Sequence, residues 1–423
     1  MTALRPIGGD GHRTCRFCGA GLSLTLVDLG DQPLANSYLT KQALALPEPR
    51  YPLHARVCQA CRLVQVGAAV PPEEIFSDYA YFSSVAASWV AHAERYAQSM
   101  RHRLCLGPAS CVVEVASNDG YLLRHFVAMG IPCLGIEPAA NVAAEARARG
   151  VPTEVAFFGH ATASRIRDRD GRADLIAANN VFAHVPDLND FAAGFAALLA
   201  PEGTLTIEFP HLLNLLRELQ FDTIYHEHYC YFSLAAAERV LAAQGLAVFD
   251  VEELPTHGGS LRLFVAHVAT RRTPGPGLAA VRAREAEGGL DTDAAYAGYA
   301  ARCATVRDGL LGFLDTMRNE GRRVAAYGAA AKGNTLLNYC GITAEDGRIA
   351  FVVDRAPSKQ GRYLPGSRIR ILGPEAIAAE KPDIVLILPW NLRREIAADL
   401  ASIAQWGGRF AVAVPKLEVF APA

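Results

Sequence analysis

Two Cys-x-x-Cys pairs near the start of the chain restrict its fold more than any other feature. One pair is Cys15 and Cys18, and the other is Cys58 and Cys61. Two residues between thiolates let both sulfurs reach one ion, and two such pairs complete the tetrahedral shell of a structural zinc site. The apolar runs around them, LSLTLVDLG and LVQVG, are short and favour hairpins with little core. We therefore expect residues 1–72 to form a small domain around structural Zn²⁺.

The composition is typical of an ordinary globular protein. Of the 423 residues 51% are hydrophobic and 20% are charged, and the net charge is −2. This balance offers no basic field for nucleic acid or an anionic membrane. The sequence has neither the apolar core of a signal peptide nor an apolar run approaching the roughly 18 residues of a membrane-spanning helix. We expect a cytoplasmic protein, a monomer or weak oligomer, with neither nucleic acid nor membrane as a partner.

From about residue 85 the pattern changes to alternating helices and strands. ASWVAHAERYAQSMRHRL has helical spacing, and VVEVA, CLGIEP, DLIAANN and GTLTIEF are β-rich runs separated by Ala-rich helical stretches. That alternation is typical of a parallel α/β sheet. LAVFDVEEL and SLRLFVAHV then follow each other closely, which predicts an antiparallel pair at the edge of the sheet.

A domain boundary is expected at RRTPGPG, over residues 271–277. A helical stretch follows, and then the β-rich runs RVAAYGAA, IAFVVDRA and DIVLILPW. We therefore predict that residues 73–275 form a central α/β domain and residues 276–423 a second, smaller one.

A strand, a turn of small residues and a helix follow one another in VVEVASNDGYLL. Such a turn presents backbone N–H groups to an anionic ligand at the carboxyl end of a sheet. The next strand ends at Glu137, which could accept hydrogen bonds from both ribose hydroxyls or could be a helix cap. The turn is not G-x-G-x-x-G and offers no obvious room for a pyrophosphate, so the pattern favours S-adenosylmethionine over NAD. Besides Glu137, the predicted cofactor-binding residues are Glu114, Ala116, Ser117, Asn118, Gly120 and, from the strand DLIAANN, Asn179.

Polar side chains also follow the strand DLIAANN. Asn180 and His184 lie four residues apart and could project into the cleft one after the other if a helical turn begins there. They would then contact the substrate. Both could instead cap the following segment.

The densest group of reactive side chains is YHEHY, with Tyr225, His226, Glu227 and His228 in sequence. Two imidazoles, a carboxylate and a phenol supply a base that titrates near neutrality, an acid that orients it and hydrogen-bond donors. The histidines lack the i, i+4 spacing of a zinc-protease helix. The alternative is a polar turn whose histidines are satisfied by the backbone.

Three further motifs could bind a substrate. Tyr79 lies in DYAYFSS, which joins the zinc module to the first long helix, where an aromatic ring could also simply pack. HGGSLR, over residues 257–262, is a binding loop or a plain hairpin turn. YGAAAKGNT follows a strand and opens a helix, so its backbone and Lys332 could hold a phosphate.

Taken together, the zinc knuckles, SNDGYLL, ANNVFAHVPD, YHEHYCYFS, HGGSLR and YGAAAKGNT resemble the sugar C-methyltransferases that act on nucleotide-linked 4-keto deoxysugars. The resemblance covers essentially the whole chain. It implies an N-terminal zinc-binding domain, a central domain with the Rossmann-like class I methyltransferase fold that binds S-adenosylmethionine, and a C-terminal α/β domain that helps to hold the nucleotide sugar.

The resemblance also implies roles for single residues. His228 would remove the C3 proton beside the C4 ketone, and the enolate would attack the sulfonium methyl group. Glu227 would orient this base, Tyr225 and Tyr79 would lie near the sugar or its phosphates, and His226 would stabilise the enolate oxygen. Asn180, His184 and Lys332 would hold sugar or phosphate oxygens.

Three other functions stay open at this stage. An O- or N-methyltransferase would use the same cofactor turn. A nicotinamide-dependent oxidoreductase could be built from the two α/β units, and a non-catalytic nucleotide-sugar-binding protein would need no base.

Overall fold

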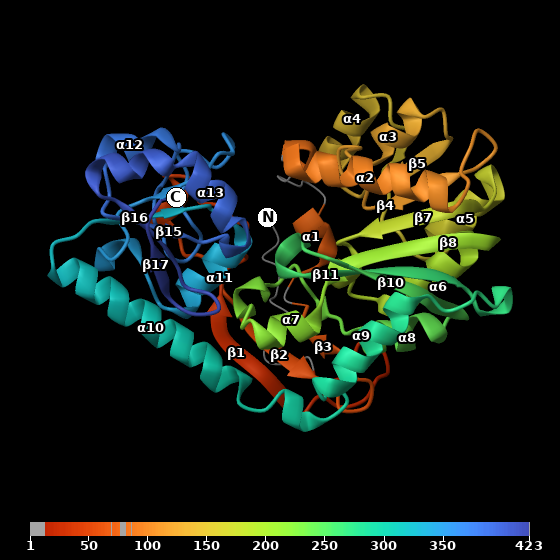
Figure 1. Ribbon diagram of the computed structural model, residues 1–423, viewed down its shortest axis with the longest axis horizontal. Coiled ribbons are helices and arrows are strands. Elements are labelled where there is room, and N and C mark those ends of the chain that lie inside the picture. Colours follow the sequence, from red (N-terminus) through yellow and green to blue (C-terminus); the bar gives the residue numbers. More distant parts are fainter. Residues whose placement is uncertain (1–12, 69, 77–81, 86, 423) are drawn as a thin grey trace.

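The structure of the protein, a computed structural model, describes residues 13–68, 70–76, 82–85 and 87–422. Within these ranges the strands form three sheets, one for each predicted domain (Figure 1). No helix in the described ranges is both long and apolar enough to cross a bilayer.

The first sheet is antiparallel and belongs to the zinc module. Its order is β1 (Leu24–Gln32), β2 (Tyr51–Val57), β3 (Val64–Gln65) and β9 (Cys230–Tyr231). Alternate residues of β2 are buried, as expected for a sheet with one face on a core. The last strand, β9, comes from the YHEHYCYFS motif far along the chain, and Val64 pairs with Tyr231 in this sheet. The zinc module is therefore joined to the central domain by strand pairing.

The central sheet has the strand order β10-β11-β8-β7-β4-β5-β6. β11 runs antiparallel to both of its neighbours, β10 and β8, and all other adjacent strands are parallel. This order and direction are those of the class I methyltransferase fold, as predicted. The predicted antiparallel pair is β10 with β11, and β10 is the edge strand. The bounds are β4 (Val112–Val115), β5 (Cys133–Ile136), β6 (Thr153–Glu154), β7 (Ala173–Asn179), β8 (Leu199–Pro210), β10 (Leu246–Leu254) and β11 (Ser260–His267).

Helices cover both faces of this sheet, which explains why its strands are apolar on both sides. Val112 and Leu175 belong to the core under α2 (Ala87–Arg103), α3 (Leu123–Ala128) and α4 (Ala140–Ala148). Their neighbours Val113 and Ile176 face the opposite core. That core includes side chains of α5 (His160–Asp170), α6 (Leu188–Leu198), α8 (Leu234–Ala242) and α9 (Pro276–Glu287).

Helix α9 packs with the central domain, although it follows the predicted domain boundary. The sequence pattern assigns it to the C-terminal domain, but Leu278 and Val281 of α9 pack in the core of the central sheet. The reason is that α9 has apolar positions that fit beside α8 and β10. The chain leaves the central domain after this helix, and the long helix α10 (Tyr299–Asn319) then leads to the C-terminal domain (Figure 1).

The C-terminal sheet is parallel apart from its last strand. The order is β14 (Ile371–Leu372), β13 (Val352–Val353), β12 (Val324–Tyr327), β15 (Ile384–Ile387), β16 (Arg409–Val412) and the antiparallel β17 (Glu418–Phe420). The helices of this domain are α11 (Ala331–Tyr339), α12 (Glu375–Glu380) and α13 (Arg393–Asp399), and the short helices α1 (Pro72–Phe76) and α7 (Leu212–Arg217) lie earlier in the chain.

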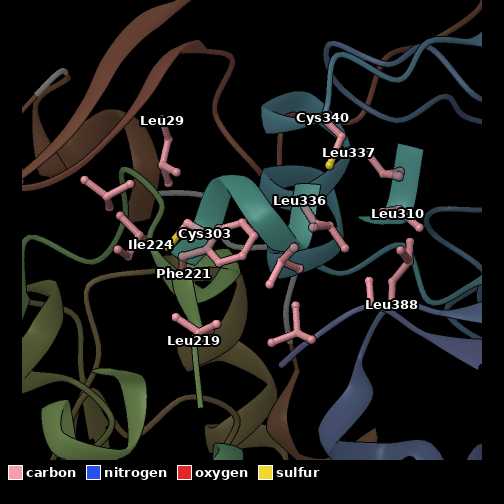
Figure 2. Packing of buried hydrophobic residues seen from close by; sticks show 14 of the residues in the cluster. Leu29, Leu219, Phe221, Ile224, Cys303, Leu310, Leu336, Leu337, Cys340 and Leu388 are labelled. Carbon is pink, nitrogen blue, oxygen red and sulfur yellow. The ribbon is translucent and has the colours of Figure 1, made fainter. Parts of the chain in front are cut away.

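One apolar cluster joins all three parts of the molecule. It contains Leu29 of β1, Phe221 and Ile224 next to the YHEH motif, Leu310 of α10 and Leu336 of α11 (Figure 2). The packing therefore holds the C-terminal domain against the segment that enters the predicted catalytic motif.

Candidate active site and zinc centre

The four predicted zinc ligands lie together. Their sulfur atoms are all within 4.8 Å of one another, with Cys15 and Cys61 3.6 Å apart and Cys18 and Cys58 3.5 Å apart. Zinc–sulfur bonds of about 2.3 Å in a tetrahedron require sulfurs about 3.8 Å apart. The cluster therefore fits a Zn²⁺ ion with four thiolates and no open position, which is a structural centre.

Both knuckles reverse direction in the same way. Gly19 and Arg62 each follow the second cysteine of a pair with φ values of 73° and 63°. In each turn the backbone N–H of this residue donates to the carbonyl of the first cysteine, at 2.9 Å and 2.8 Å. The two short loops therefore form equivalent halves of one shell.

The zinc knuckles contact the central domain close to His184. The Arg16 guanidinium donates to the carbonyl of Pro186 at 3.0 Å, and Asn189 donates to the carbonyl of Phe17, also at 3.0 Å. Arg239 of α8 donates to the carbonyl of Cys61 at 2.8 Å. The centre thus supports the segment that follows β7.

The predicted cofactor turn has an unusual backbone. Ala116, Asn118 and Gly120 all have positive φ, at 57°, 50° and 76°. At Gly120 a Cβ would approach the Val151 side chain to 2.9 Å, so glycine is required for space as well as conformation. Glu137, at the end of β5, accepts from the backbone N–H groups of Asn118 and Ala139, each at 2.9 Å. Its buried carboxylate therefore fixes the turn and keeps further lone pairs for a ligand.

Buried polar atoms without hydrogen-bond partners line the carboxyl ends of β4 and β7. Such atoms are costly unless a ligand or water satisfies them. These two parallel strands are adjacent and connect to opposite sides of the sheet, which is where ligands bind in open α/β folds. The donor set fits a polar nucleoside cofactor such as S-adenosylmethionine. The atoms are Glu114 Oε2, Ser117 Oγ, Asp119 Oδ1, Asn179 Oδ1 and both amide atoms of Asn180.

The Asn118 and Asp119 side chains contact the segment before α2. Its Oδ1 accepts from the backbone N–H of Ser83 at 2.8 Å, and Asp119 Oδ2 accepts from Ser84 and from Arg149. These contacts fasten the entrance of α2 to the cofactor turn. Asn118 would therefore contribute to cofactor binding through its backbone and its position in the turn.

His228 is held in one tautomer. Its Nδ1 lies 3.0 Å from the carbonyl of Thr223, which can only accept, so Nδ1 carries the proton. Its Nε2 therefore has a free electron pair, which accepts from the Tyr225 hydroxyl at 2.9 Å. Burial is the main cause of a pKa well below the usual histidine value, and the His184 ring, 4.6 Å away between centroids, lowers it further. The structure therefore brings a neutral His228 imidazole together with Tyr225 and His184.

Glu227 does not orient His228 in the predicted way. Its Oε1 accepts from the Asn36 amide at 2.7 Å, and the carbonyl of Thr223, not this carboxylate, accepts from Nδ1 of His228. The reason is geometric, because Glu227 precedes His228 and points toward the zinc module. Burial raises the pKa of Glu227 to about 7.

His226 is also turned toward the zinc module. Its Nε2 lies 3.2 Å from the carbonyl of Tyr51 and its ring meets the Tyr51 ring edge to face, at 5.9 Å. Its Nε2 therefore donates to β2, while its buried Nδ1 has no hydrogen-bond partner. Burial lowers the pKa of His226.

Lys332 lies in the contact between the central and C-terminal domains. Its Nζ donates to Asn391 Oδ1 at 2.8 Å and lies 4.5 Å from the centre of the Trp390 ring. Burial lowers the pKa of Lys332, and the buried Asp222 partly offsets this effect. Tyr79, the remaining predicted residue, lies outside the described residues.

Four residues near the base were not predicted. They are Asn36, Asp222, Thr223 and Trp390, which hold Glu227, His228 or each other. Asp222 and Thr223 lie just before YHEH in QFDTIYHEH. The acidic residue inside this apolar stretch is the sequence signal that could have identified them. Nothing local marked Asn36 or Trp390, because they come from other domains.

Three protein families match successive parts of the chain. The family described as "Putative zinc binding domain" matches residues 15–76, "Methyltransferase domain" matches residues 89–251, and "C-methyltransferase C-terminal domain" matches residues 255–415. C-methyltransferase NovU of Streptomyces niveus is 37% identical over 405 residues, which is 96% of each chain.

More distant matches cover smaller shares of the chain. Ubiquinone biosynthesis O-methyltransferase of Rhodopseudomonas palustris (strain BisA53) is 25% identical over 23% of this chain and 38% of its own length. The crystal structure of magnesium protoporphyrin IX methyltransferase (ChlM) from Synechocystis PCC 6803 with bound SAH gives a TM-score of 0.34 at 13% identity. That match covers 42% of this chain and 83% of the other.

Proposed function

The chain belongs to the S-adenosylmethionine-dependent C-methyltransferases, and we propose that it methylates C3 of a nucleotide-linked 4-keto deoxysugar through an enolate. One observation carries the proposal: a buried, neutral His228 whose Nδ1–H is held by Thr223 and whose Nε2 keeps its lone pair. Methylation at carbon needs a base to create a carbanion, and a histidine in this state is such a base.

His228 and Tyr225 have different roles in the proposed reaction. Carbon 3 lies beside the C4 ketone, so His228 Nε2 can take its proton and leave an enolate. The Tyr225 hydroxyl donates to Nε2 in this structure, and it would turn to the C4 oxygen as the sugar takes its place beside Nε2. One such fixed donor is worth about 2.7 to 4 kcal/mol of transition-state stabilisation. When bound, S-adenosylmethionine supplies an electrophilic methyl group.

The proposed binding residues lie on both sides of His228. Asn180 keeps both amide atoms buried without a partner at the end of β7, and His184 contacts the His228 ring. Lys332 contributes a positive charge from the C-terminal domain, where its Nζ lies 4.5 Å from the centre of the Trp390 ring. We assign these three side chains to the oxygens of the sugar and its phosphates.

A panel of acceptors tests the substrate class. The protein should transfer labelled methyl groups from S-adenosylmethionine to at least one 4-keto nucleotide sugar, and NMR of the product should place the methyl on C3. The same sugar reduced at C4 should accept none, because it cannot form an enolate. Methylation of the reduced sugar would instead support an O- or N-methyltransferase.

The pH dependence tests the state of the base. The lowered pKa keeps His228 neutral to a lower pH, so kcat/KM should fall on the acid side only below the ordinary histidine pKa of about 6.5. Glu227→Gln should leave this limb in place, because Thr223 and not Glu227 holds Nδ1. A fall in kcat/KM that begins at or above pH 6.5 would contradict the assignment of His228 as the base. A shift of this fall along the pH axis in Glu227→Gln would contradict it as well.

We also propose the cytoplasm as the place of action. All ten cysteines are free, and cysteines outside the zinc cluster stay reduced in that compartment. A monomer or weak oligomer remains our prediction for the assembly state.

A further inference from the structure

We propose that Trp390, on the turn after β15 of the C-terminal domain, is a positioning residue for His228. This inference rests on the proposed role of His228 as the base. It assigns to the C-terminal domain a part in the chemistry besides binding the substrate.

A continuous chain of contacts connects the two side chains. Trp390 Nε1 donates to Asp222 Oδ2 at 2.8 Å. The carbonyl of Thr223, the next residue in the chain, accepts from His228 Nδ1 at 3.0 Å. Trp390 is therefore separated from the catalytic imidazole only by Asp222 and Thr223.

The C-terminal domain holds the segment on both sides of Thr223. Trp390 binds Asp222 before it, and the Thr335 hydroxyl of α11 donates to the carbonyl of Ile224 after it, at 3.2 Å. Phe221 and Ile224 pack in the cluster with side chains of α11 (Figure 2). With residues 222 and 224 both fixed, the direction of the Thr223 carbonyl is set by the C-terminal domain.

The Trp390 ring packs against residues of two sequence motifs. In HGGSLR, a Cβ on Gly258 would come within 2.5 Å of the Trp390 ring, and Gly258 also has a φ of 89°. In YGAAAKGNT, Lys332 lies over the ring. Gly258 is therefore needed where the indole approaches the central domain.

Burial makes the bond to Asp222 important. The Asp222 side chain is completely buried, its Oδ1 has no hydrogen-bond partner, and burial raises its pKa to about 6. Without the indole N–H this carboxylate would lose its only side-chain donor among the described residues, and it would have to take up a proton or move. Either change disturbs the peptide that holds His228.

Trp390→Phe tests the inference because it keeps the ring and removes only the donor. We expect kcat and the rate of C3 proton exchange to fall about ten-fold while KM and the affinity for S-adenosylmethionine change less than about two-fold. Thr335→Val should act in the same direction. The double variant of Trp390→Phe with Asp222→Asn should be no slower than the slower single variant, since both act on the same bond, which Trp390→Phe removes and Asp222→Asn weakens by removing the charge of the acceptor.

Trp406→Phe is the matched control. Trp406 lies in the same domain and its Nε1 donates to the carbonyl of Pro382 at 3.0 Å. It should lose a similar hydrogen bond without any change in kcat. In histidine-labelled protein, the Nδ1–H signal of His228 should exchange with water faster in Trp390→Phe and unchanged in Trp406→Phe.

The outcomes separate this inference from the proposed function. Unchanged kcat and an unchanged Nδ1–H signal in Trp390→Phe would overturn the positioning role, even if His228→Gln is inactive. Proton exchange that survives in His228→Gln would overturn the base assignment instead. Additive effects of Trp390→Phe and Asp222→Asn would also contradict the inference.

Discussion

His228→Gln should remove methyl transfer and C3 proton exchange together, with kcat falling about 10³-fold. A positioned general base contributes about 10² to 10⁴ in rate, and His228 is the group at this site with a neutral nitrogen lone pair set by its tautomer. Glutamine keeps a donor for the Thr223 carbonyl but offers no base of comparable strength. Exchange is measured by NMR in D₂O, in the presence of the demethylated cofactor, and methyl transfer with labelled donor.

The affinity for S-adenosylmethionine should stay unchanged in this variant, since the cofactor turn belongs to β4 and β5. His160→Gln, at the exposed start of α5, serves as the control for the general effect of replacing a histidine. If His228→Gln retained proton exchange, another group would have to be the base. Loss of methyl transfer with full exchange would place His228 after the proton-transfer step.

The parts of the site that sequence reasoning could predict are those encoded by contiguous motifs. Glycine at position 120 and the acid at 137 follow from the strand–turn–helix pattern, and the tight Cys-x-x-Cys pairs define their own geometry. The motif YHEH likewise places Tyr225 beside His228. In each case neighbouring residues in the chain are also neighbours in the site.

The division of roles inside YHEH could not be predicted in this way. Whether Glu227 or Thr223 holds His228 depends on the direction in which each side chain leaves the backbone, and that direction is fixed by contacts from other domains. Asn36 turns Glu227 toward the zinc module, and Trp390 binds beside Thr223 from the C-terminal sheet. These partners lie 191 and 168 residues away along the chain, in segments without a recognisable motif.

The placement of β9 and α9 was missed for a related reason. Cys230–Tyr231 is too short to be recognised as a strand, and it pairs only because β3 of the zinc module is available. Pro276 resembles a domain boundary, but apolar residues further along α9 find a place on the central core. Tertiary packing, which local patterns do not encode, determined both outcomes.

Cys58→Ser should release zinc and lower the melting temperature by about 10 °C, because the ion is the main link between the two knuckles. Cys58 is completely buried, and a serine hydroxyl does not replace a thiolate in a tetrahedral zinc shell. The module has little core of its own, and its sheet is completed by β9, two residues after His228. Metal content by mass spectrometry and thermal unfolding by circular dichroism measure the two effects.

Cys105→Ser is the matched control, since Cys105 is exposed and lies outside the zinc cluster. It should keep both the metal and the melting temperature. Zinc does not touch the reacting atoms, so the Cys58→Ser protein that remains folded at low temperature should still bind S-adenosylmethionine. Its kcat should fall only because the Arg16–Pro186 contact and the β3–β9 pairing are weakened. A zinc-free variant with normal stability and activity would show that the metal does not support this fold. A specific loss of cofactor binding would contradict the purely structural role that the four-thiolate shell indicates.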